Sequence, residues 1–187
     1  MPKTSFSYFF FAILLLVIVC TGISCDLLTT DTGESFDFFA SFPSAQIVPE
    51  TGGQGTPTGK IAFVQKGWDI GGRSKDALIV LASGKLIYDV PAGRAGDRLV
   101  FSGGMRLLLG DGATGMVLVQ LSSRLDTLYK KFLNPVDNPQ DRKWFDASVD
   151  LTRYKGFPIK IIFATDAGPR GDGTADWFAF GDPVLTY

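Results

Sequence analysis

Short apolar runs alternate with turn-forming residues along most of this chain. From residue 60 onward, runs of about four to six residues recur at intervals of roughly 8–12 residues, with Gly, Pro, Asn and Asp between them. The runs are 61–64, 77–81, 85–88, 98–101, 106–109, 116–121, 128–132, 147–151, 159–164 and 177–180. No window sustains the 3.6-residue apolar stripe of an amphipathic helix. The pattern therefore predicts an all-β domain, a sandwich or a barrel.

Two local patterns refine this prediction. Ala147, Val149 and Leu151 alternate with polar residues, which places one face of a strand inward and the other toward solvent. Ser83-Gly84 separates two apolar runs and predicts a tight hairpin turn, because glycine readily adopts the positive φ that such turns require.

The first 25 residues have the layout of a secretory signal peptide. Lys3 is followed by an apolar run from Tyr8 to Cys20 and then by small residues up to Cys25. Ile23-Ser24-Cys25 resembles the end of a lipobox, in which the cysteine becomes a lipid-modified N-terminus, although Gly22 stands where that motif usually has Leu. A lipoprotein anchored through Cys25, simple secretion and an uncleaved anchor remain open.

The remainder divides into an N-terminal segment, 26–59, and a β-sandwich domain, 60–187. The segment ends in a Gly/Thr/Pro-rich stretch, 51–59, which is typical of a loop. Its Phe-rich patch, 36–42, is too apolar for a free tether. We expect the patch to form a strand or short helix that packs on the domain.

Composition excludes several kinds of chemistry. The chain of 187 residues has no histidine, and its two cysteines, Cys20 and Cys25, lie in or beside the leader. A Ser-His-Asp or Cys-His nucleophile pair and a histidine-ligated metal are thereby excluded. The two glutamates, Glu34 and Glu50, precede the regular strands, so no pair of them suggests a glycosidase. We expect no enzymatic activity and no resident cofactor apart from the calcium considered below.

Charge likewise narrows the partners. Lys and Arg number 18 against 19 Asp and Glu, which gives a formal net charge of −1. Nucleic acid binding normally needs a basic face. The balance therefore argues against a nucleic acid partner.

The C-terminal third carries a familiar pattern. Trp144 and Val149-Asp150-Leu151-Thr152-Arg153-Tyr154-Lys155-Gly156 resemble a stretch of extracellular jelly-roll modules of the galactose-binding-like and carbohydrate-binding-module-like types. Residues 158–165 are similar to their next strand and 176–183 to their closing strand, although Phe178 and Phe180 stand where relatives often have Ala and Trp. The resemblance implies a jelly-roll-like antiparallel β-sandwich, and it does not imply a particular ligand.

Sugar-binding sites stack an exposed aromatic ring on the apolar face of a pyranose and grip its hydroxyls with polar groups. Trp68 is the best candidate, because 66–73 reads as a loop beyond a strand, and Asp69 and Arg73 could supply the polar grip. The alternative is that Trp68 plugs one end of the core. Trp144 and Trp177 occupy strand-like positions, where we expect core packing.

Three aspartates with glycines between them lie in the stretch 165–176. Asp166, Asp172 and Asp176 could supply oxygen ligands to a structural calcium ion, which many jelly-roll sandwiches carry. Asp-Gly pairs are also ordinary turn formers, so turn chemistry remains the alternative.

Two functions from different classes follow. The first is a non-catalytic carbohydrate-binding-like module, exported to the cell envelope, that binds a glycan or cell-wall polymer. The second is a structural or assembly lipoprotein that docks onto a protein partner through an exposed sandwich face, with the membrane contacted through its lipid anchor.

Overall fold

The computed structural model describes residues 35–49, 60–106, 110–171, 173 and 175–187. These residues form three single-turn 3-10 helices, Phe42–Ser44 (η1), Pro139–Asp141 (η2) and Thr152–Tyr154 (η3), and the ten strands that make up the domain. The strands are β1 (Gln46–Pro49), β2 (Ala62–Ile70), β3 (Arg73–Leu81), β4 (Gly84–Val90), β5 (Arg98–Met105), β6 (Ala113–Leu121), β7 (Arg124–Leu133), β8 (Phe145–Asp150), β9 (Ile159–Asp166) and β10 (Trp177–Thr186).

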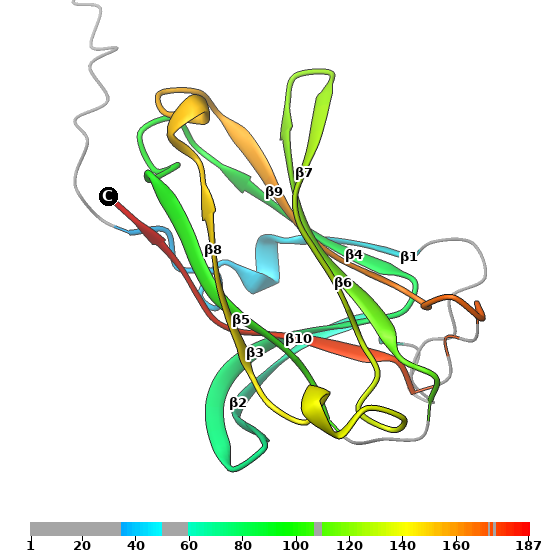
Figure 1. Ribbon diagram of the computed structural model, residues 1–187. Helices are drawn as coiled ribbons and strands as arrows, with labels where there is room; N and C mark the ends of the chain where they lie inside the picture. Colours follow the sequence, from blue (N-terminus) through cyan, green and yellow to red (C-terminus); the bar gives the residue numbers. More distant parts are fainter. Residues whose placement is uncertain (1–34, 50–59, 107–109, 172, 174) are drawn as a thin grey trace, which may run out of the picture. The chain divides into compact units, whose positions relative to one another are not determined.

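The strands form two five-stranded antiparallel sheets. Sheet A has the order β1-β4-β9-β6-β7, and sheet B has the order β2-β3-β10-β5-β8. Contacts of β6 and β9 with β10, and of β7 with β8, place the sheets face to face, as Figure 1 shows. The predicted antiparallel β-sandwich is confirmed.

Alternate residues of the two sheets meet in one main core. Its centre is aromatic: Phe180 lies 4.9 Å from Phe163 and 5.0 Å from Phe178, measured between ring centroids, and all three are fully buried. Small residues make room for the rings. A Cβ on Gly115 of β6 would lie 2.3 Å from Phe178. The described residues contain no cysteine, so this apolar burial must hold their fold together.

Residues 35–49 contribute to this core. Phe36 and Phe38 are buried, and Phe38 makes edge-to-face contacts with Tyr88 and Phe163 at 5.1 and 5.3 Å. After η1, strand β1 pairs with β4 at the edge of sheet A. Phe-rich residues that precede the regular strands therefore fill the space between the sheets.

Ser83-Gly84 does not form the predicted hairpin turn. The strands on either side belong to different sheets, β3 to sheet B and β4 to sheet A, so the connection crosses from one layer to the other. Gly84 is required by space and not by a positive φ: a Cβ there would lie 2.4 Å from Ile61 Cγ2 and 2.8 Å from Leu81 O. In sequence, a hairpin turn within one sheet cannot be told from a short connection between two sheets.

A β-bulge reshapes the hairpin of β2 and β3. Gln65 pairs with Ala77 but Trp68 pairs with Lys75, so β2 contains one extra residue between these pairs. Gly67 in the bulge has a φ of +61° and donates its N–H to Asp76 Oδ1 at 2.9 Å. The bulge brings Trp68 to the same face of the sheet as Phe63, which strict alternation would not do. Figure 1 shows the strong curvature of this hairpin.

Candidate functional site

A second hydrophobic cluster lies on the face of sheet B that points away from the main core. We call it the outer cluster. Its buried members are Ile70, Ala77, Ile79, Leu81, Trp144 and Ala179. Three aromatic side chains, Phe63, Trp68 and Trp177, are half-buried and pack against it. This sheet face thus carries apolar and aromatic groups where a sandwich usually presents polar residues to water.

Trp144 anchors the outer cluster. Its ring lies in a notch made by two glycines, because a Cβ on Gly104 or Gly181 would lie 2.8 or 2.9 Å from ring atoms. The indole Nε1 donates to Arg73 O at 2.7 Å, and only 3% of the residue is exposed. Trp144 therefore ties the residue preceding β8 to the start of β3.

The three half-buried aromatic residues form a row. The ring of Phe63 is in the middle, 6.5 Å from Trp68 at an interplanar angle of 76° and 5.8 Å from Trp177 at 87°. These are edge-to-face contacts, which favour the pairs beyond their buried area. We call these residues the aromatic row.

Arg106, which directly follows β5, completes one end of the row. Its guanidinium carbon lies 4.6 Å from the centroid of the Trp68 ring, a cation–π contact, and the residue is exposed. The positive charge of Arg106 therefore lies against the indole of Trp68, the best sugar-binding candidate in the sequence.

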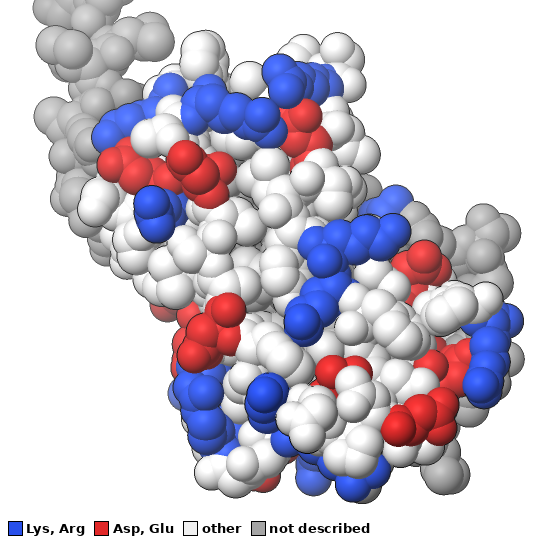
Figure 2. Space-filling model, in the orientation of Figure 1, with Lys and Arg blue, Asp and Glu red and all other residues white. Residues whose placement is uncertain are grey.

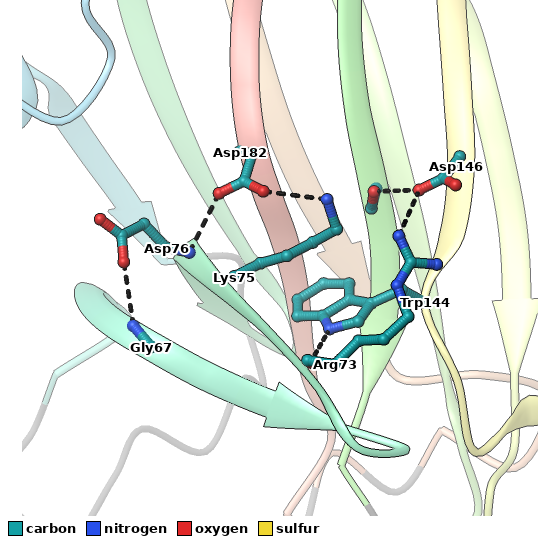
Figure 3. A network of polar contacts seen from close by, with 8 residues as sticks. Gly67, Arg73, Lys75, Asp76, Trp144, Asp146 and Asp182 are labelled. Carbon is teal, nitrogen blue, oxygen red and sulfur yellow. Dashed lines mark hydrogen bonds and ion pairs between the residues drawn. The ribbon is translucent and has the colours of Figure 1, made fainter.

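Two ion pairs border the outer cluster. Lys75 Nζ lies 2.9 Å from Asp182 Oδ2, and Arg73 lies 3.7 Å from Asp146 Oδ1 (Figure 3). The Asp182 side chain is 52% exposed and that of Asp146 67%, so both carboxylates remain open to solvent. We call Arg73, Lys75, Asp146 and Asp182 the polar pairs.

The polar pairs are held in place by further hydrogen bonds. Asp182, which has a φ of +45° in a bulge of β10, accepts from Asp76 N at 3.0 Å. Ser102 Oγ donates to Asp146 at 2.6 Å. That hydrogen bond, together with the charges of Arg73 and Lys75, lowers the pKa of Asp146. The carboxylate is thus an ionised acceptor over the whole neutral range.

The predicted ligand-binding residues are only partly brought together. Trp68 and Asp69 lie in β2 and Arg73 begins β3, whereas a loop was predicted for this stretch. The register places Trp68 and Arg73 on one face and Asp69 on the other. The Asp69 carboxylate accepts a hydrogen bond from Gly72 N at 3.4 Å, where it supports the hairpin turn.

Sequence reasoning missed most of the other members of this surface. It placed Trp177 in the core, but Trp177 is half-buried in the aromatic row. Phe63, Arg106, Asp146 and Asp182 carried no distinguishing signal, because strands distant in sequence bring them together. The one available hint was Gly67, four residues after Phe63, because a glycine within a strand often marks a bulge.

Only two of the three predicted calcium ligands lie in the described residues. Asp166 is exposed at the end of β9, Asp176 is completely buried before β10, and Asp172 lies outside the described residues. Within the part of the chain that the structure describes, no group of three Asp, Glu, Cys or His residues could hold a metal ion. The calcium site stays a prediction.

The surface charge is mixed. On the side shown in Figure 2, basic and acidic side chains lie next to one another and are separated by uncharged surface. On this face, the arrangement agrees with the near-zero net charge of the chain.

Comparison with known proteins bears mainly on the fold. No family model matches the chain. An uncharacterized protein of the archaeon Archaeoglobus fulgidus is 40% identical over 78 residues, which are 42% of this chain and 20% of that protein. The chain thus matches only about a fifth of this curated relative's length.

Solved structures with a similar fold include carbohydrate-binding modules, adhesin domains of Lys-gingipain and an insecticidal crystal protein. TmCBM61, solved in complex with β-1,4-galactotriose, is similar with a TM-score of 0.50 and 14% identity over 78% of this chain and 90% of that one. The CBM51 of Clostridium perfringens GH95, solved with methyl-galactose, gives a TM-score of 0.47 and 15% identity over 75% and 92%. The domain therefore has a β-sandwich fold like that of carbohydrate-binding modules, and the predicted resemblance in fold is confirmed.

Proposed function

We propose that this chain is a non-catalytic carbohydrate-binding module of the cell envelope, and that it binds glycans on the outer face of sheet B. The observation that carries the proposal is the aromatic row of Phe63, Trp68 and Trp177, which is half-buried beside the polar pairs. The fold shared with carbohydrate-binding modules supports the same class of function.

The geometry suits sugar recognition. Aromatic rings offer flat apolar surface to the C–H face of a pyranose, while groups that both donate and accept hydrogen bonds fix its hydroxyls. Lys75 and Asp182 offer donors and acceptors 2.9 Å apart, and Arg73 and Asp146 repeat the arrangement. Because both pairs are anchored by strands of one sheet, little conformational freedom would be lost on binding.

Replacing Trp68 with alanine is expected to weaken glycan binding by about tenfold or more, which is about 1.4 kcal/mol. Stability should fall less, because the residue is half-buried and lies at the margin of the outer cluster. A glycan array would identify the ligand, and isothermal titration well below the melting temperature would measure the affinity.

The matched control is Phe132→Ala, which removes a 42% exposed aromatic ring from β7, in the other sheet. It should leave glycan affinity unchanged. Full affinity in Trp68→Ala would contradict the assignment of the aromatic row. Absence of any glycan ligand, together with co-purification of a protein partner, would instead support the docking lipoprotein.

The location at the envelope is also part of the proposal. The leader and Cys25 lie outside the described residues, and within those residues there is no helix long and apolar enough to span a membrane. We expect the mature protein to begin at Cys25 and to carry a lipid there. Intact mass spectrometry of protein purified from membranes would show the added mass, and Cys25→Ser should abolish it. An N-terminus at Met1 without added mass would contradict export by this route.

A further inference from the structure

Arg106, which contacts the aromatic row, has no carboxylate partner among the described residues. Arg73 and Lys75 each lie beside an aspartate, at 3.7 and 2.9 Å. Arg106 instead contacts an aromatic ring: its guanidinium carbon lies 4.6 Å from the centroid of the Trp68 ring. Each of the polar pairs joins one positive and one negative side chain, and Arg106 places a positive charge at one end of the aromatic row.

The stacked position prepares the guanidinium to bind an anion. An indole face holds a planar guanidinium through the ring quadrupole and shields one of its faces from water. The N–H groups at the edge of the guanidinium remain available, and their fork matches the two oxygens of a carboxylate. A lysine could not combine these roles, because its ammonium is a point charge.

We propose that the aromatic row selects an acidic glycan, with the carboxylate of a uronic acid unit bound by Arg106 and neighbouring sugar rings lying along Phe63 and Trp177. The inference rests on the proposed function and names the ligand class of the same site. Charge complementarity supports it, because this end of the row carries a positive charge that the polar pairs leave uncompensated.

The test compares an oligogalacturonide with the same oligosaccharide after methyl esterification, which removes the charge and keeps the sugar rings. We expect the wild-type protein to bind the acid at least about tenfold more tightly than the ester, and the difference to shrink as salt is raised. Arg106→Gln should abolish the difference. Lys130→Gln, an exposed cation on β7 in the other sheet, should preserve it.

The possible failures are distinguishable. Equal affinity of the wild-type protein for acid and ester, with Trp68→Ala still losing both, would overturn the acidic ligand class and leave the proposed function standing. A full acid preference in Arg106→Gln would overturn the role of this residue. Binding of neither probe nor of any glycan on an array would overturn both proposals. Because Arg106 is exposed, the variant should fold, and its melting temperature verifies this.

Discussion

Replacing Phe38 with alanine is expected to lower the free energy of unfolding by about 3–5 kcal/mol, the usual loss for a fully buried phenylalanine. Phe38 is 0% exposed. Its ring lies 5.1 Å from Phe36, 5.1 Å from Tyr88 and 5.3 Å from Phe163, in edge-to-face contacts. Truncation would remove these contacts and leave a cavity between the two sheets. Urea denaturation followed by tryptophan fluorescence would measure the change.

The control for this experiment is Phe157→Ala, which truncates a phenylalanine that is 52% exposed. It should change the free energy of unfolding by less than about 1 kcal/mol. A Phe38 variant as stable as wild type would show that the segment before residue 60 adds nothing to the core. The expected result would instead make residues 35–49 an integral part of the sandwich, since β1 of the same segment pairs with β4.

The fold class was predictable because its signals are local. The alternation of Ala147, Val149 and Leu151 with polar residues predicts which side of this strand faces inward. In the structure Val149 and Leu151 are buried and Ala147 is partly buried, so the predicted side is the correct one. The assignment of strands to sheets was not local. Ser83-Gly84 has the composition of a hairpin turn, but Gly84 is needed for its close approach to Ile61, a contact that no sequence spacing reveals.

The sequence pointed to two residues of the candidate site, Trp68 and Arg73, and not to the rest. A lone tryptophan next to charged residues marked Trp68, but its orientation depends on the extra residue at the Gly67 bulge, which moves it onto the face of Phe63. Strict alternation would have grouped Phe63 with Asp69. Asp146 comes from β8 and Asp182 from β10, the two strands that flank β5 in sheet B. Only the order of the strands in the sheet brings these carboxylates near β3. The order of strands in the sheet therefore determines which residues meet on this surface.

Trp144 is the residue on which the stability of this surface depends most. We expect Trp144→Ala to lower the free energy of unfolding by about 3–5 kcal/mol, because the residue is only 3% exposed and its indole fills the notch over Gly104 and Gly181. The variant also loses the hydrogen bond from Nε1 to Arg73 O, which holds the start of β3. Glycan affinity should fall as well, although Trp144 itself is too buried to contact a sugar.

Trp144→Phe separates packing from hydrogen bonding. The substitution keeps most of the apolar volume and removes the indole N–H. The missing hydrogen bond should lower the free energy of unfolding by about 1 kcal/mol, and the smaller ring should lower it somewhat further. Chemical denaturation and isothermal titration on the same samples would measure both effects. If Trp144→Ala kept full glycan affinity at a temperature where it remains folded, the ligand would not depend on the start of β3, and Arg73 could not be part of its site. If affinity falls in parallel with stability across wild type, Trp144→Phe and Trp144→Ala, the outer cluster is the support on which the aromatic row and the polar pairs are held for binding.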